Sequence, residues 1–311
     1  MEHIDGVGFR RLGDENSLSG PQTYARVIME MKQLPDNNEL TKTLCDMSRC
    51  ADILVIDGKY VAVKGFNRKI PFLFGLDYLS HDILHGQLFL AEDEASFSLF
   101  FQKLKDLSYN LKIVVADDRF GIKQALNKVF PYARLQLCQN HYLENIRKDL
   151  KVKKEQRYRH FFNSLKKHVF THAITDQEIT DGLKHVLEHH SRNNPRLMAI
   201  LAAIDARRYD LFAYRYFEHC PNNTNLIELY NSHLNGRLKT IKGFQSLKSA
   251  QRWLNAWMIR RRTKTFTDCD TKFKHLNKHC SLEFTIKKQA QWPDILTKLG
   301  IKPIKYFEKS D

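Results

Sequence analysis

The sequence has no long apolar run. No stretch approaches the roughly 20 apolar residues that a helix needs to cross a bilayer, and the opening residues MEHIDGVGFRRLGDEN lack the apolar core of a secretory signal peptide. These absences exclude membrane and exported proteins from the expected classes. We therefore expect no membrane partner and a cytoplasmic location, at the nucleoid of a bacterial cell or in the nucleus of a eukaryotic one.

The sequence also lacks a cysteine framework. Its six cysteines are scattered along 311 residues, which favours free thiols in a reducing compartment over disulfides. Cys45 and Cys50 lie near each other and could supply half of a metal site, but no second pair of ligands lies close by in the sequence. Ordinary packing is therefore the favoured interpretation for both.

Positive charge is what the sequence has in excess. The chain carries a formal net charge of +15, and +12 of it falls within residues 229–311. A field concentrated in one segment suits a polyanion, whose condensed counterions are released on binding, although solvated helix faces are a common alternative. The sequence thus favours a nucleic-acid partner. The candidates for contacts with DNA phosphates are Lys239, Lys242, Arg260, Arg261 and Arg262.

The order of predicted elements indicates an α/β protein. After a loose lead-in (1–20), apolar residues three and four apart predict one helix over 21–47. Short apolar and alternating segments then predict strands at 53–57, 59–65, 69–80 and 83–91, with a tight turn at Gly58 between the first two. Strands at 112–117 and 133–138 follow, between helices at 92–110, 119–131 and 139–150. Such an order predicts a mixed sheet with helices on its faces.

Strand patterns vanish over residues 151–220, where every segment has helical periodicity. We therefore expect five parts along the chain. They are an N-terminal lead-in and helix (1–50), the first part of the core (51–150), a helical insertion (151–220), the rest of the core with two helices (221–266) and a basic C-terminal tail (267–311).

Two aspartates lie at predicted strand ends. Asp57 ends the strand ILVID and Asp117 ends KIVVAD, and functional groups gather outside the carboxyl ends of parallel strands. If these strands are neighbours, the two carboxylates repel unless a cation neutralises them, and hard oxygen ligands select Mg²⁺ or Mn²⁺. Taken alone, an Asp at a strand end more often caps a turn.

Two longer segments carry a family resemblance. Residues 114–146 contain an apolar strand ending in Asp117, a helix with Ala-Leu, a Phe-Pro-x-Ala turn and a strand ending in Cys138-x-x-His141. Residues 224–257 contain Asn, then Glu228, then Asn, followed by a basic stretch and Gly-Phe-x-Ser. Together with VIDGKYVAVK, these segments resemble the core of Mutator-like transposases, including the related bacterial insertion-sequence families.

The resemblance covers roughly residues 51–285 and implies an RNase H-like fold with an all-helical insertion before the third acid. It implies that Asp57, Asp117 and Glu228 form a DDE triad holding two Mg²⁺ or Mn²⁺ ions. It further implies a DNA transposase that cleaves transposon ends and joins their 3′-hydroxyls to target DNA, acting as a homo-oligomer.

Competing residues exist for the second and third acids. Asp118 follows Asp117 directly, and Asp117 is preferred because it ends the apolar strand. Glu144 competes with Glu228, but its place in the helix after Cys-x-x-His favours a solvent-facing role.

Other polar residues have structural interpretations. Cys138 and His141 supply only half of a tetrahedral zinc site, so buried packing, with a histidine that orients backbone or contacts DNA, is the favoured account. Asp77 and Asp82 lie among the early strands, where turn or edge roles are expected.

Two other functional classes remain. A domesticated or decayed copy would bind DNA without cleaving it, although the presence of all three acids argues against it. A structure-selective nuclease could share the fold, although the basic segment and Gly-Phe-x-Ser disfavour it. Family members usually carry a DNA-binding region ahead of the first acid, whereas 56 residues with one predicted helix precede Asp57. We therefore expect a truncated frame or a lost or separately encoded module.

Overall fold

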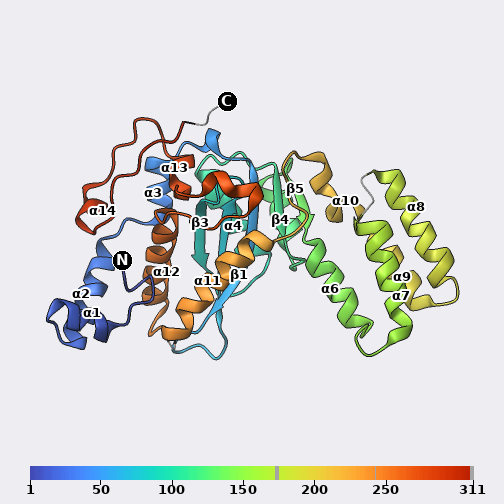
Figure 1. Cartoon of the computed structure of the whole chain (residues 1–311), viewed down its shortest axis with the longest axis horizontal. Coiled ribbons are helices and arrows are strands. Elements are labelled where there is room, and N and C mark those ends of the chain that lie inside the picture. Colours follow the sequence, from blue (N-terminus) through green and yellow to red (C-terminus); the bar gives the residue numbers. More distant parts are fainter. Residues whose placement is uncertain (172–174, 242, 309–311) are drawn as a thin grey trace. The chain divides into compact units, whose positions relative to one another are not determined.

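The computed structural model of the chain describes residues 1–171, 175–241 and 243–308 (Figure 1). Its strands are β1 (Ile53–Val61), β2 (Ile70–Asp77), β3 (Ile83–Leu88), β4 (Ile113–Ala116) and β5 (Arg134–Leu137). They form one mixed sheet in the order β3-β2-β1-β4-β5. The predicted α/β class, a mixed sheet flanked by helices, is confirmed and is compatible with an RNase H-like fold. Within the described ranges, every helix is too short or too polar to cross a bilayer.

The chain divides into two compact units. The larger contains Met1–Lys112, Phe120–Ala133 and Asn225–Asp311, and the smaller contains Ile113–Arg119 and Arg134–Thr224. The helices of the larger unit are α1 (Phe9–Asn16), α2 (Gly20–Gln33), α3 (Asn37–Leu44), α4 (Glu94–Asp106), α5 (Ile122–Val129), α11 (Asn225–Ile241), α12 (Leu247–Arg262), α13 (Ser281–Thr285) and α14 (Asp294–Lys298).

Strands β1, β2 and β3 of the larger unit form an antiparallel meander, in which β1 pairs with β2 and β2 pairs with β3. Strand β1 runs unbroken through Gly58, which lies opposite Leu73. The tight turn predicted at Gly58 is therefore wrong, and one strand replaces the two predicted at 53–57 and 59–65. A Cβ at this glycine would collide with the Glu92 carboxylate, so Gly58 serves a close approach and not a turn.

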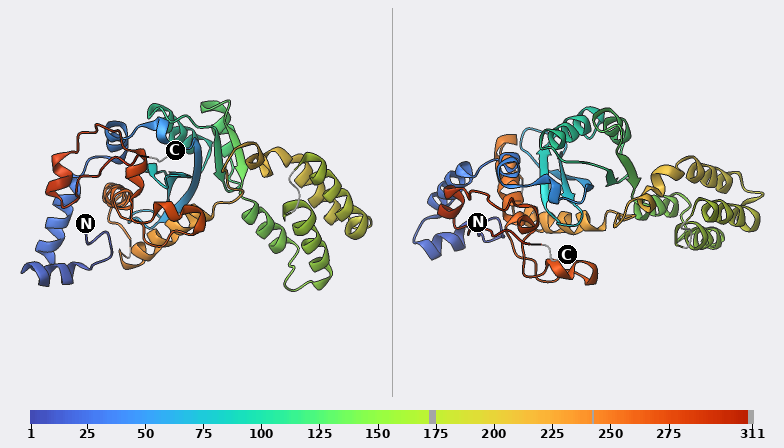
Figure 2. Two further views of the ribbon diagram at one scale, coloured as in Figure 1. Left: turned by 45° about the horizontal axis from the view of Figure 1, so that its top comes forward. Right: turned by 90° about the horizontal axis from the view of Figure 1, so that it is seen from above.

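Helices cover both faces of this meander (Figure 2). Alternate residues of a strand point to opposite faces. Gly75 lies against Phe100 of α4 on one face, whereas Phe72 and Phe74 make edge contacts with Trp257 of α12 on the other. All eight residues of β2 are buried as a result, and the core of the unit lies on both sides of this strand.

The N-terminal part contains three helices where the sequence predicted one. Helix α1 forms within the expected lead-in, and the predicted helix over 21–47 is divided into α2 and α3. Leu34 precedes Pro35 and is extended, with φ −63° and ψ 135°, because proline disfavours helical backbone in the residue before it. Asp36 then starts α3 by accepting the N–H of Asn38 at 2.9 Å.

The smaller unit joins two parallel strands to a set of helices. Strands β4 and β5 pair in register from Ile113 opposite Arg134 to Ala116 opposite Leu137. The helices are α6 (Gln139–Asp149), α7 (Arg159–Leu165), α8 (Asp176–Val186), α9 (Pro195–Ala206) and α10 (Arg208–Leu211), labelled in Figure 1. Buried Leu165 and Val186 lie on α7 and α8, which are in contact.

Candidate active site

The carboxyl ends of β4 and β5 carry a cluster of functional side chains. Because the strands are parallel and Ala116 lies opposite Leu137, the residues that follow them, Asp117 and Cys138, emerge at the same edge. The N–H of Cys138 donates to the Ala116 carbonyl at 2.8 Å, which extends the ladder by one residue. The local sequence therefore places a carboxylate beside a thiol.

Helix α6 begins directly after Cys138 and adds an imidazole. Residues three apart are neighbours on a helix surface, so Cys138-x-x-His141 turns the histidine toward the strand ends. His141 Nδ1 lies 2.6 Å from Asp117 Oδ1, and the two side chains are 41% and 17% exposed, whereas Cys138 is buried. The ligand atoms of Asp117, Cys138 and His141 all lie within 4.8 Å of one another.

Thr224 brings a hydroxyl into the same cluster. Its Oγ1 lies 3.2 Å from Cys138 Sγ, 3.4 Å from Asp117 Oδ1 and 3.4 Å from His141 Nδ1. Its backbone N–H donates to Cys138 Sγ at 3.4 Å. Sequence reasoning missed this residue, because it lies 83 positions after His141 and no local pattern marks it.

The surroundings of Cys138 favour a neutral thiol. Burial raises the pKa of the Cys138 thiol, and the nearby Asp117 carboxylate acts in the same direction. The hydroxyl of Thr224 and the backbone N–H groups of His141 and Thr224 oppose this shift of the pKa without cancelling it. The pKa of Cys138 is therefore above its ordinary value, and the sulfur is a protonated group at neutral pH.

Asp57 lies within β1 and not at a strand end as predicted, because the strand continues to Val61. Its position nevertheless marks a change: residues 53–56 are buried, and residues 57–60 are partly or fully exposed. Asp57 Oδ1 accepts the N–H of Gly58 at 2.7 Å, and Oδ2 accepts the side-chain amide of Asn231 at 2.5 Å. The carboxylate is thus held at the point where β1 leaves the core.

Glu228 lies in the first turn of α11 and is exposed. Asn231 lies three residues after Glu228, so the two side chains are neighbours on the helix surface. The hydrogen bond from Asn231 to Asp57 therefore holds the turn of α11 that carries Glu228 against β1. The hydroxyl of Tyr230 donates to the His81 carbonyl at 2.9 Å and anchors the same turn. Asn231 is the asparagine that follows Glu228 in the sequence pattern, which gave it no role. Asp57 and Glu228 belong to the larger unit and Asp117 to the smaller.

The two competing acids are engaged in ion pairs. Asp118 Oδ1 accepts from the guanidinium of Arg207 at 2.6 Å. Glu144 accepts two hydrogen bonds from Arg147, at 2.6 and 2.7 Å. A guanidinium therefore neutralises each of these carboxylates locally.

One of the basic residues predicted to contact DNA lies in the core. Arg262 is fully buried, and its guanidinium donates to both carboxylate oxygens of Asp82 at 2.8 Å. A group that is out of contact with solvent cannot reach a phosphate, so the DNA contact predicted for Arg262 is wrong. Asp82 lies in the turn between β2 and β3, as expected, where its carbonyl accepts the N–H of Asp77 at 3.0 Å. Its carboxylate has a further role that was not expected, as the buried partner of Arg262.

The remaining basic candidates have varied surroundings. Arg260 Nε donates to Asp5 at 2.9 Å, and the guanidinium of Arg261 lies 5.0 Å from the ring centre of Tyr230. Lys239 is exposed in the last turn of α11. Lys242 lies outside the described residues. Contacts of Lys239, Lys242, Arg260 and Arg261 with DNA stay predictions.

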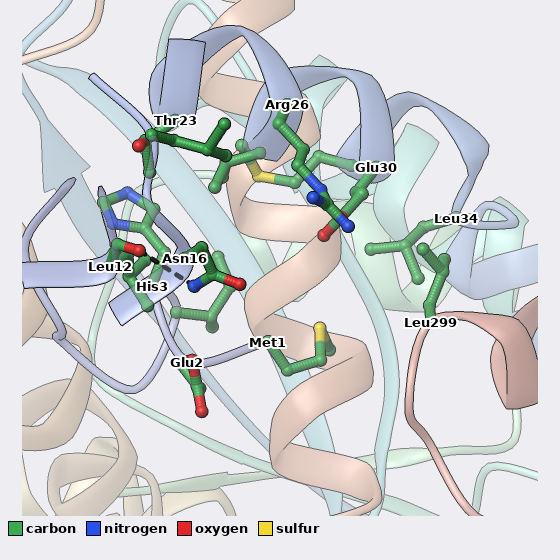
Figure 3. A pocket seen from close by; sticks show the side chains of 14 residues that line it. Met1, Glu2, His3, Leu12, Asn16, Thr23, Arg26, Glu30, Leu34 and Leu299 are labelled. Carbon is green, nitrogen blue, oxygen red and sulfur yellow. Dashed lines mark hydrogen bonds and ion pairs between the residues drawn. The ribbon is translucent and has the colours of Figure 1, made fainter. Parts of the chain in front are cut away.

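A pocket of about 160 Å³ opens beside the N-terminal helices (Figure 3). Arg26 and Glu30, which line it, form an ion pair at 3.2 Å, and the Asn16 amide donates to the Leu12 carbonyl at 2.8 Å. None of the predicted site residues that the structure describes is among its lining residues. We assign it no part in the site.

Comparisons with known proteins agree with the resemblance seen in the sequence. Residues 47–266 match the family described as "Transposase, Mutator family". This match covers more than half of the chain, and the chain therefore belongs to the Mutator family of transposases.

Two relatives carry the same description in different organisms. Over 172 residues the chain is 28% identical to "Transposase for insertion sequence element IS256 in transposon Tn4001" of Staphylococcus aureus and of Enterococcus faecalis (strain ATCC 700802 / V583). The alignment covers 54% of this chain and 43% of each relative. The chain thus matches less than half of the length of these curated relatives.

Proposed function

We propose that the chain is the catalytic part of a DDE transposase, in which Asp57, Asp117 and Glu228 hold two Mg²⁺ or Mn²⁺ ions. Membership of the Mutator family carries this proposal, because the matched segment, residues 47–266, contains all three acids. The hydrogen bond between Asp57 and Asn231 adds support, since it ties the strand of the first acid to the helix of the third.

The donor set fits these ions. Carboxylate oxygens are the hard ligands that Mg²⁺ and Mn²⁺ prefer. Two bound ions supply activation of a water or a 3′-hydroxyl and stabilisation of the leaving oxygen in an in-line displacement at phosphorus. The chain's own groups orient the ligands: Asn231 and the N–H of Gly58 fix the Asp57 carboxylate, and His141 fixes that of Asp117.

The proposed substrate is DNA, comprising the transposon ends and a target duplex, and the working form is a homo-oligomer. The excess of +12 within residues 229–311 supports a polyanionic partner. Lys239 is exposed on α11, the helix that also carries Glu228. Lys242, Arg260 and Arg261 complete the proposed phosphate contacts, which position the DNA without reading its sequence.

The test is cleavage and strand transfer by the purified chain with Mg²⁺ on duplexes that carry the ends of its element. We expect Asp57→Ala, Asp117→Ala and Glu228→Gln each to lower the cleavage rate at least about a hundredfold, because the transition-state charge loses its stabilisation. Glu144→Gln is the matched control, since that carboxylate is paired with Arg147, and it should cleave like the unmodified chain.

Two results would contradict the proposal. If Asp57→Ala and Asp117→Ala still cleave DNA, these residues are not part of a catalytic triad. DNA binding without cleavage under any divalent ion would assign the chain to the DNA-binding derivatives of the family.

A further inference from the structure

We propose that Asp117, Cys138 and His141 form a site for a borderline-soft divalent cation of the Zn²⁺ class, which shares Asp117 with the proposed Mg²⁺ site. All three residues belong to the smaller unit. The consequence for activity rests on the proposed function: an ion held here takes Asp117 as a ligand and withdraws it from the DDE triad.

The donor set carries the choice of ion. It combines a carboxylate oxygen, a sulfur and an imidazole nitrogen within 4.8 Å. Thiolate and imidazole are poor ligands for Mg²⁺ but good ones for Zn²⁺, which accepts sulfur, nitrogen and oxygen in one site. The cysteine and histidine recognisable in the sequence are half of such a site, and the fold adds the third ligand from the end of β4.

The distances from Thr224 to the three ligand atoms are close to those between the corners of a tetrahedral zinc site. Zn²⁺ bonds of 2.0–2.3 Å give ligand atoms about 3.3–3.8 Å apart, which is about 1.6 times the bond length. Thr224 Oγ1 lies 3.2 Å from Cys138 Sγ and 3.4 Å from both Asp117 Oδ1 and His141 Nδ1. The hydroxyl thus marks a fourth corner, filled by itself or by a water. The Asp117–His141 contact of 2.6 Å opens by less than about 1 Å to admit the ion.

Two features around Cys138 favour its thiolate and oppose the effect of burial. The sulfur accepts the N–H of Thr224 at 3.4 Å, and Cys138 is the N-cap residue of α6, an eleven-residue helix. The positive end of a helix stabilises a thiolate. When the ion binds, the thiol proton leaves to solvent and the sulfur takes the metal in its place. His141, which is 41% exposed, leaves the cluster open to an entering ion.

The experiment is a titration of the purified full chain with Co²⁺, without DNA. Co²⁺ substitutes for Zn²⁺ and reports a bound thiolate by a charge-transfer band in the near ultraviolet. We expect one equivalent of Co²⁺ to produce this band and Zn²⁺ to abolish it. Cys138→Ala should lose the band, and His141→Ala and Thr224→Val should each weaken Co²⁺ binding by about tenfold or more.

The matched control is Cys220→Ala, which removes a half-buried cysteine of the same unit and should keep the band. Circular dichroism shows whether each variant is folded. If Cys138→Ala does not fold, His141→Ala tests the site independently. A folded chain without the band, or a band that survives Cys138→Ala, overturns the proposal. Because the titration contains no DNA, a negative result contradicts the zinc site and not the transposase proposal. Conversely, a chain that binds Co²⁺ but never cleaves DNA contradicts the transposase proposal and not the zinc site.

Discussion

Two polar clusters of this chain contain similar side chains but differ in how completely they are enclosed. In the larger unit, Arg262 and Asp82 are both fully buried. The guanidinium also donates to Asn37 at 3.0 Å, Thr41 at 2.7 Å and Cys45 at 3.0 Å, and Asp82 accepts from Ser281 at 3.1 Å and Thr285 at 2.6 Å. All three guanidinium nitrogens therefore have partners. We call this set the Arg262 network.

In the smaller unit, the cluster of Asp117, Cys138, His141 and Thr224 is partly open to solvent. It also brings a carboxylate, a cysteine and a threonine together, but a partly exposed imidazole takes the place of the buried guanidinium. The closed network holds its charges out of solvent and stabilises the fold. The open cluster is partly accessible to solvent, which is what the proposed ion binding requires.

The largest loss of stability is expected from opening the Arg262 network. Arg262→Met should lower the free energy of unfolding by about 3–5 kcal/mol, because it leaves the Asp82 carboxylate buried without a counter-charge. Denaturant titration followed by circular dichroism measures this change.

The double variant Asp82→Asn, Arg262→Met is the control for that prediction. It removes both charges, so it should recover a large part of the lost stability. A loss of less than about 1 kcal/mol for Arg262→Met, in the range of exposed ion pairs, would break the distinction between the two clusters.

The next effect concerns a buried histidine beside the Arg262 network. His85 Nδ1 contacts Asn38 Oδ1 at 2.7 Å, while its buried Nε2 has no hydrogen-bond partner among the described residues. Burial, with a smaller contribution from Lys103, lowers the pKa of His85 from 6.5 to about 3. The folded chain therefore keeps this imidazole neutral where the unfolded chain protonates it.

The sign of the pH dependence follows from that pKa. Above pH 6.5 the histidine is neutral in both states and adds no pH dependence. As the pH falls from 6.5 toward 3, the unfolded chain binds the additional proton, and the free energy of unfolding falls by about 1.4 kcal/mol per pH unit. His85→Gln should reduce the slope measured by unfolding at pH 7, 6 and 5, and the part that remains includes His81, whose pKa burial lowers to about 4. The control is His160→Gln, on an exposed position of α7, which should leave the slope unchanged. An unchanged slope in His85→Gln would show that the buried His85 does not cause the pH dependence.

Much of the open cluster could be predicted from the sequence, because local patterns determine it. An apolar strand ending in Asp117 and a second one leading into Cys138-x-x-His141 meet as soon as the two strands pair in parallel. The contacts of Thr224 and Asn231 were not predictable, because their partners His141 and Asp57 lie 83 and 174 residues away. Contacts of this length depend on the whole fold and leave no periodicity in the sequence.

The closed network was misread for a related reason. Arg260, Arg261 and Arg262 are consecutive, and charge alone suggests one basic surface. Helix α12 turns each of them in a different direction, and only Arg262 meets the buried Asp82. The turn predicted at Gly58 is wrong for a similar reason. Glycine is typical both of turns and of positions where another group lies close to the backbone, and at Gly58 the Glu92 carboxylate occupies the space that a Cβ would need.

A smaller effect on stability is expected at the open cluster. Asp117→Asn should change the free energy of unfolding by no more than about 1.5 kcal/mol, since it keeps the shape of the side chain and removes a charge beside a partly exposed histidine, while cleavage falls at least about a hundredfold. Thermal unfolding and cleavage are measured on one preparation. A loss of stability equal to that of Arg262→Met would show that Asp117 holds the fold.

The smallest effect is expected at the carboxylate beside Asp117. Asp118 is paired with Arg207, but both side chains are more than a third exposed, so solvent screens the charges and added salt weakens the pair. Arg207→Met should therefore cost no more than about 1 kcal/mol, and this cost should shrink at high salt, as measured by urea titration at two salt concentrations. A salt-independent loss as large as that of Arg262→Met would mean that enclosure is not what separates the two clusters. If the loss is small, the ion pair of Asp118 with Arg207 contributes little to the fold because solvent screens it.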